Sequence, residues 1–136
     1  MELKINNITR YYDDKLILDH INAHIVDKEA IAIIGPSGAG KSTLLRLLSK
    51  IEEPDEGSIC VNNNHLNEID PGEYYKSIGF VFQAHTLFPH LTVLRNITLV
   101  LEQVHNYSKT KANEIAITLL RHFELEDHME KRASQL

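Results

Sequence analysis

The sequence lacks features that several classes of protein require. Cys60 is its only cysteine, so no internal disulfide can form and we expect a reducing compartment. No apolar run approaches the roughly 20 residues that span a bilayer, and the N-terminus lacks the hydrophobic region of a signal peptide. The formal net charge is -5 and no basic stripe is visible, which argues against nucleic acid as the main partner.

Metal-site spacing is also absent, because the eight histidines are scattered and only one cysteine accompanies them. We interpret these histidines as structural or surface residues. The composition that remains is that of a globular protein, with 136 residues, 43% of them hydrophobic and 24% charged. This length suits one domain with a sizeable core.

One stretch has a chemically specific pattern, in which two glycines separated by four residues are followed by Lys and Ser. Glycines let the backbone turn tightly and direct several N–H groups toward a polyanion. Lysine then adds a positive charge for the β- and γ-phosphates, and the serine hydroxyl is a natural Mg²⁺ ligand. The pattern therefore predicts a triphosphate-binding loop. Its residues are Gly35, Pro36, Ser37, Gly38, Ala39, Gly40, Lys41, Ser42 and Thr43.

The flanking sequence supports this interpretation over a chance glycine-rich turn. Residues 30–34 form a continuous apolar run typical of a strand buried on both faces. Residues 41–50 carry four leucines without Gly or Pro, which predicts a helix that begins at the loop. The helix N-terminus would add a partial positive charge beside the phosphates.

Alternating apolar residues predict an opening strand near residues 3–8, a second over 16–26, and a turn at Asp13 and Asp14. Tyr11 and Tyr12 end the first strand. Either ring can stack on a purine base or pack across the strands, and the residues alone leave both interpretations open. Another strand is expected from Gly57 to Val61.

A second strongly apolar strand is expected over residues 78–82, ending at Gln83. An amide at this position can face a ligand or simply cap the strand. Thr92 is placed to cap a helix from about Val93 to Val104, and Ser108 to cap an amphipathic helix with its apolar stripe in the core. Glu102 is a weak candidate for a metal-binding carboxylate.

Three of these segments together resemble the ATP-binding subunit of an ABC transporter, in the branch that serves polar amino-acid importers. They are the loop at residues 35–43, the segment 78–83 and the stretch 87–97. The resemblance covers essentially the whole chain, although Arg95 stands where the family pattern leads us to expect an acidic or neutral residue. It implies an α/β fold: an incomplete RecA-like phosphate-loop core with an N-terminal antiparallel β portion and the start of a helical subdomain.

The resemblance also implies roles for single residues. Tyr12 takes the place of the adenine-stacking aromatic, Lys41 and Ser42 bind the phosphates and Mg²⁺ of ATP, and Gln83 contacts Mg²⁺ and the lytic water. Residues 84–92 would face transmembrane permease subunits. Residues 1–92 would form the nucleotide-binding core and 93–136 the opening of the helical subdomain. The implied whole is a head-to-tail dimer at the cytoplasmic face of the membrane that powers import of a small polar solute.

The family's signature motif, its second Mg²⁺ motif and its switch histidine are not found in the sequence. We therefore expect a fragment that binds ATP weakly or not at all and shows no turnover. A loop-dependent ATPase rate abolished by Lys41→Ala would contradict this. The alternative is a nucleotide-binding or interaction module that does not hydrolyse ATP. A GTPase or small-molecule kinase is disfavoured by the lack of a base-reading Asn-Lys-x-Asp motif and of an Arg-rich lid.

Overall fold

The structure is a computed structural model that describes residues 1–84 and 87–135. It divides into two compact units, Met1–Phe80 and Val81–Leu136. In chain order, the first unit contains β1 (Glu2–Tyr12), β2 (Lys15–Val26), α1 (Lys41–Leu48), β3 (Glu56–Val61), β4 (Asn64–His65), the 3₁₀ helix η1 (Leu66–Glu68) and α2 (Pro71–Ser77). The second contains α3 (Val93–Gln103), α4 (Lys109–His122), η2 (Glu126–His128) and η3 (Ala133–Gln135).

The first unit is built on a four-stranded sheet with the order β2-β1-β3-β4. Every pairing is antiparallel, and β1 lies between β2 and β3. The predicted opening strand, second strand and Gly57–Val61 strand are confirmed, as is the turn at Asp13, whose φ is 52°. β1 and β2 pair as a hairpin of neighbouring segments, whereas β3 pairs with β1 from a distant part of the chain, with Ile5 opposite Ile59.

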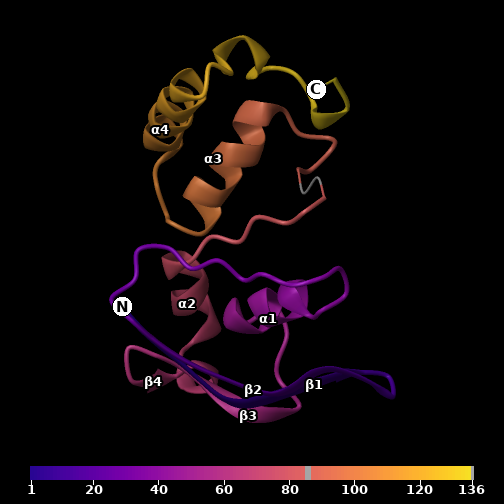
Figure 1. The fold of residues 1–136 in the computed structure, drawn as a ribbon. Helices are drawn as coiled ribbons and strands as arrows, with labels where there is room; N and C mark the ends of the chain where they lie inside the picture. The colour runs from indigo at the N-terminus through magenta and orange to yellow at the C-terminus, as the bar shows by residue number, and fades with distance from the viewer. Residues whose placement is uncertain (85–86, 136) are drawn as a thin grey trace. The chain divides into compact units, whose positions relative to one another are not determined.

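The core of this unit lies between the sheet and two helices. Figure 1 shows α1 and α2 on the same face of the sheet. Leu3 and Ile5 of β1 point toward this face, as the two-residue period of a strand requires, and a register shift between Ile5 and Ile8 then brings Ile8 into the core. The Tyr74 hydroxyl of α2 donates to the Leu48 carbonyl at 2.6 Å, which ties α2 to the end of α1. The buried cluster consists of Leu3, Ile5, Ile8, Leu18, Leu47, Ile59, Leu66 and Tyr74.

The two apolar strands predicted over residues 30–34 and 78–82 are wrong, because neither segment forms a strand. Ile34 is 92% exposed and Val81 is 95% exposed. A strand needs a neighbour that accepts its ladder of hydrogen bonds. Among residues 1–84 and 87–135, the hydrogen-bonded ladders lie within the sheet formed by the four strands β1, β2, β3 and β4. One isolated bridge, between Thr92 and Arg132, lies outside this sheet. Apolarity without a pairing partner therefore left both runs outside the sheet.

The second unit contains the two longer helices, and their predicted caps are confirmed. Thr92 Oγ1 accepts a hydrogen bond from Arg95 N at 3.1 Å, and Ser108 Oγ accepts one from Lys111 N at 3.3 Å. The apolar stripe of α4 is only partly buried, because Leu119 is 43% exposed and Phe123, the residue that follows the helix, is 65% exposed. The buried residues Ala112, Ala116 and Leu120 lie four apart. In the part of the chain described, no helix has the length and apolarity needed to cross a membrane.

Burial along α1 gives a direct stability prediction. Leu47 is 1% exposed within the core, whereas Leu45 on the same helix is 46% exposed. We expect Leu47→Ala to lower the free energy of unfolding by about 2–5 kcal/mol, because it removes buried methyl groups and leaves a cavity. Leu45→Ala, the matched control, should change it by less than about 1 kcal/mol. Denaturant unfolding of both variants measures the difference, and equal losses would contradict the position of α1.

Candidate functional site

The phosphate-loop candidate is a turn that leads directly into α1. Ala39 N donates to the Pro36 carbonyl at 3.3 Å, which closes the turn, and Gly38 has a φ of 80°. The first helical hydrogen bond runs from Leu44 N to the Gly40 carbonyl at 2.9 Å. The helix therefore begins at Lys41, where the sequence predicted it.

Gly40 joins the loop to the sheet. It is the residue before α1, it is buried, and its backbone is left-handed with φ 79° and ψ 6°. A Cβ atom here would lie 2.6 Å from Leu18 Cδ2 and 3.1 Å from the Ile17 carbonyl oxygen, both in β2. Any residue other than glycine would have to adopt a strained conformation, and the Leu18 side chain and the Ile17 carbonyl would have to shift to admit its Cβ. The start of α1 is thus fixed against the β1–β2 hairpin.

The N-terminus of α1 is open to an anion. No side chain forms a capping hydrogen bond there, and the first turn contains no acidic residue. The first N–H groups of a helix have no acceptor within the helix, and the helix dipole makes this end partly positive. Ser42 is exposed beside these groups, whereas Thr43 is buried. Pro36, Ser37 and Ala39 are exposed along the turn.

Lys41 places its ammonium group at the beginning of the loop. Its Nζ donates to the Gly35 carbonyl at 2.9 Å and to the Pro36 carbonyl at 2.7 Å. These acceptors are neutral, so an anionic phosphate oxygen would form a stronger, charge-assisted hydrogen bond with the same ammonium. The structure thus brings Gly35, Gly38, Gly40, Lys41 and Ser42 into one local arrangement that can hold a polyanion.

Tyr12 is part of a polar cluster that sequence reasoning missed. Its hydroxyl donates to Glu52 Oε2 at 2.6 Å, and the Arg10 guanidinium carbon lies 5.2 Å from the centre of its ring. Hydrogen bonding with Tyr12, and then the charge of Glu52, raise the pKa of Arg46 in the last turn of α1. Neighbouring Tyr11 is 41% exposed, and its backbone N donates to Asp55 Oδ2 at 2.7 Å.

Gln83 lies in the second unit, and its side chain is exposed. Within the predicted permease-facing segment, residues 84–92, His85 and Thr86 lie outside the described residues. Buried Asn96 holds the rest of this segment against α3: its Oδ1 accepts from Phe88 N at 2.7 Å and its Nδ2 donates to the Thr92 carbonyl at 2.9 Å. Sequence reasoning missed this role of Asn96.

Arg95 and Glu102, which the sequence set apart, form an ion pair on α3. They are seven residues apart, so both side chains lie on one face of the helix. This pair gives the unexpected Arg95 a partner and occupies the carboxylate that was a weak candidate for metal binding. Among the residues that the structure describes, no group of three or more His, Cys, Asp or Glu side chains is arranged to hold a metal ion.

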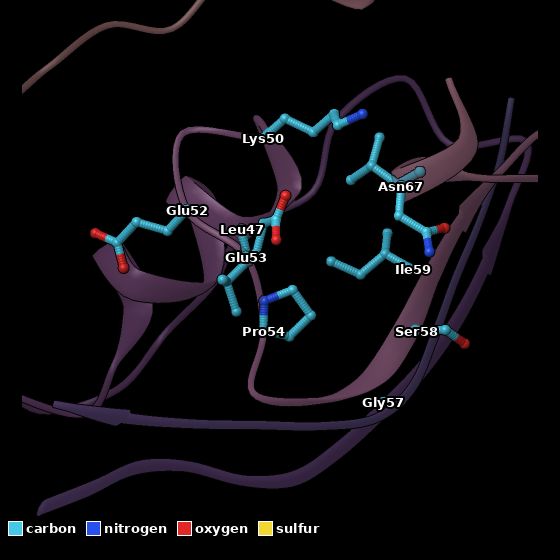
Figure 2. Close-up of a pocket in the computed structure, with 10 residues that line it drawn as sticks. Leu47, Lys50, Glu52, Glu53, Pro54, Gly57, Ser58, Ile59 and Asn67 are labelled. Atoms are coloured by element: carbon cyan, nitrogen blue, oxygen red, sulfur yellow. The ribbon is translucent and has the colours of Figure 1, made fainter. Parts of the chain in front are cut away.

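A pocket of about 180 Å³ lies elsewhere in the first unit, between β3 and the segment that follows α1 (Figure 2). Its lining includes Leu47, Lys50, Glu53, Pro54 and Ile59. None of residues 35–43 lines this pocket. It is therefore separate from the open end of α1, where the groups predicted to bind phosphate lie.

Comparison with known proteins places this loop in a family context. The sequence model described as "ABC transporter" matches residues 18–136. The chain is 39% identical to the sulfate/thiosulfate import ATP-binding protein of Synechocystis sp., over 100% of this chain and 38% of the relative. It is 35% identical to the glutamate transport ATP-binding protein of Corynebacterium efficiens, over 98% of this chain and 56% of the relative. It is 38% identical to the general L-amino acid transport ATP-binding protein of Rhizobium johnstonii, over 98% of this chain and 53% of the relative.

Solved structures of ATP-binding cassettes have the same fold as this chain. An ATP-binding cassette solved as a dimer in a post-hydrolysis state, bound to ADP and Pi, superposes with a TM-score of 0.82 at 33% identity. The match covers 98% of this chain and 62% of that one. A dimeric bacterial ABC transporter cassette gives the same TM-score at 34% identity. The chain thus spans between 38% and 56% of the length of the three curated relatives above.

The contact between Gly40 and β2 yields a testable contrast with Gly38. Both glycines are left-handed, but a Cβ at Gly38 would meet nothing within 4 Å. We expect Gly40→Ala to lower the free energy of unfolding by at least about 2 kcal/mol, and Gly38→Ala by about 1 kcal/mol from backbone strain alone. Thermal and denaturant unfolding of the two variants measure this order. A reversed order would show that the loop does not rest on β2.

Proposed function

This chain belongs to the ABC transporter family, and from that premise we propose that it supplies the nucleotide-binding core of an ABC-type ATPase, with ATP and Mg²⁺ bound at residues 35–43. The observation that carries the proposal is the loop itself: a turn ending in left-handed Gly40, followed by a helix without a side-chain cap, with the Lys41 ammonium held beside it. All of these groups favour a polyanion.

The loop supplies three kinds of contact to the triphosphate. Main-chain N–H groups of the turn and of the first turn of α1 hold phosphate oxygens, and Lys41 exchanges its two carbonyl partners for the β- and γ-phosphates. The exposed Ser42 hydroxyl and the Gln83 amide are the proposed ligands of Mg²⁺, which neutralises phosphate charge when bound. Gln83 would also orient the attacking water, so Lys41 and Gln83 are the proposed catalytic residues.

Tyr12 is the proposed contact for the adenine ring. It stands at the end of β1, and the hairpin that carries it touches the phosphate loop through Ile17 and Leu18. Base stacking on an aromatic side chain contributes about 1–3 kcal/mol to binding. The polar cluster around the hydroxyl favours this role over simple cross-strand packing, because it holds the ring by its edge.

The proposed transporter couples this site to membrane subunits. We assign permease contact to residues 84–92, in which the Leu87 and Phe88 side chains are exposed and the Phe88 backbone is anchored to α3 through Asn96. Large exposed apolar side chains at one place are typical of protein interaction sites. In this proposal residues 1–92 form the nucleotide-binding core, and residues 93–136 open the helical subdomain.

The proposed assembly is a dimer of ATP-binding subunits at the cytoplasmic face of the membrane. Two structural relatives, both dimeric cassettes, support the dimer. Relatives whose names specify glutamate and general L-amino acid transport support import of a small polar solute such as an amino acid. The sulfate/thiosulfate relative leaves the choice of polar solute to experiment.

Removing the Lys41 charge tests the nucleotide site. In the native gene product, Lys41→Met should weaken ATP binding about 10- to 100-fold, the effect of losing a charge-assisted hydrogen bond to phosphate. Lys28→Met, which removes an exposed lysine in the loop after β2, is the matched control and should leave the dissociation constant within about twofold. Calorimetry with Mg²⁺ and ATP measures both, and equal affinities for Lys41→Met and wild type would refute the proposal.

Turnover separates the proposed ATPase from the alternative. Steady-state phosphate release that disappears in Lys41→Met and falls in Gln83→Ala supports hydrolysis. Tight ATP binding without any phosphate release, by the native gene product with its membrane partners present, would instead identify a nucleotide-binding module that does not hydrolyse ATP.

A further inference from the structure

We propose that Glu52 is a positioning residue for nucleotide binding: its carboxylate holds the Tyr12 hydroxyl and so fixes the plane of the ring on which the base stacks. This inference rests on the proposed function, because it concerns Tyr12 as the base-contacting residue. It adds a residue that belongs to no motif in the sequence and lies 40 positions away from Tyr12.

The hydroxyl contact is short and partly shielded from water. Tyr12 donates to Glu52 Oε2 at 2.6 Å, and the Glu52 side chain is only 21% exposed. The other carboxylate oxygen, Oε1, accepts from Arg46 NH1 at 3.3 Å. Both oxygens of Glu52 therefore have partners, which restricts the rotation of the carboxylate and, through it, of the Tyr12 ring.

Arg10 restricts the ring from another direction. Its guanidinium carbon lies 5.2 Å from the ring centre, a distance at which a cation is attracted to an aromatic face. Arg10 is itself held, since its NH1 donates to Asp55 Oδ1 at 3.0 Å and its Nε lies 3.7 Å from Glu52 Oε2. Because the guanidinium covers one face of the ring, a base has only the opposite face on which to stack.

Helix α1 links this ring to the phosphate loop. At its N-terminal end Gly40 rests on Ile17 and Leu18 of β2, and toward its C-terminal end Arg46 contacts Glu52. The same hairpin carries Tyr12, which pairs with Lys15 at the start of β2. Since α1 is rigid and about 12 Å long, its two contacts fix the distance between the phosphate-binding groups and the ring.

The residue next in the chain offers a matched control. Glu52 and Glu53 both belong to the residues that line the pocket, but Figure 2 shows the Glu52 side chain extending away from the other lining side chains. Glu52 and Glu53 therefore carry the same charge on the same loop but face different surroundings. Only Glu52 has a hydrogen bond to Tyr12.

Pre-ordering of a side chain lowers the entropy lost when a ligand binds. In the native gene product, Glu52→Ala and Tyr12→Phe should each weaken ATP binding about three- to tenfold, because each leaves the ring but removes the contact that orients it. The double variant should be no weaker than Glu52→Ala alone, because the hydrogen bond that Tyr12→Phe removes is already lost in Glu52→Ala. Glu52→Gln retains an acceptor oxygen and should restore most of the affinity, and Glu53→Ala should match wild type.

Binding of inorganic tripolyphosphate distinguishes loss of base positioning from general damage to the structure. It contacts only the phosphate groups of the site, so its dissociation constant should stay within about twofold of wild type in Glu52→Ala and Tyr12→Phe. Calorimetric titrations of each variant with ATP and with tripolyphosphate make the comparison, alongside melting temperatures.

Each outcome has a distinct meaning. Unchanged ATP affinity in Glu52→Ala, or an equal loss for ATP and tripolyphosphate, would overturn the positioning role and leave the proposed function standing. If the wild-type protein binds neither ATP nor tripolyphosphate, the proposed function fails and this inference with it. Selective weakening of ATP in both single variants, without further loss in the double variant, supports the assignment.

Discussion

The close approach of Gly40 to β2 is the constraint on which the rest of this structure depends. A backbone without a Cβ lets the start of α1 lie directly against Ile17 and Leu18, in a left-handed conformation that other residues adopt only with strain. That contact places the open helix terminus, the Lys41 ammonium and the exposed Ser42 hydroxyl beside the hairpin that carries Tyr12. In the proposed function, one short helix thereby fixes the distance between the phosphate-binding and the base-binding groups.

Signals within a few residues predicted the caps, the turn and the strands β1, β2 and β3, but apolarity alone did not predict whether residues 30–34 and 78–82 find a partner strand. The caps at Thr92 and Ser108, the Asp13 turn and the start of α1 follow from interactions within a few residues, so the sequence shows them directly. The strands expected at residues 30–34 and 78–82 are absent because a strand requires a neighbour, and apolarity says nothing about which segment pairs with it.

The same distinction applies to the site. Glycine and lysine spacing predicted the candidate phosphate loop, because the groups it needs lie in consecutive residues. The cluster around Tyr12 joins Arg10, Arg46, Glu52 and Asp55, which are brought together only by folding. One local signal was available: Arg10 and Tyr12 lie two apart on a strand, and so share a face. Asn96 gave no such signal, because its hydrogen bond with the Phe88 backbone forms only when the segment before α3 folds against that helix.

The central claim is that main-chain amides at the start of α1 hold phosphate. Two-dimensional ¹⁵N–¹H spectra of the native gene product, titrated with Mg²⁺ and ATP, test it at the level of single amides. The account predicts that the resonances of Gly38, Gly40, Lys41 and Ser42 shift first and most strongly, saturating together. Shifts that fall on other residues while these four stay unchanged would contradict it.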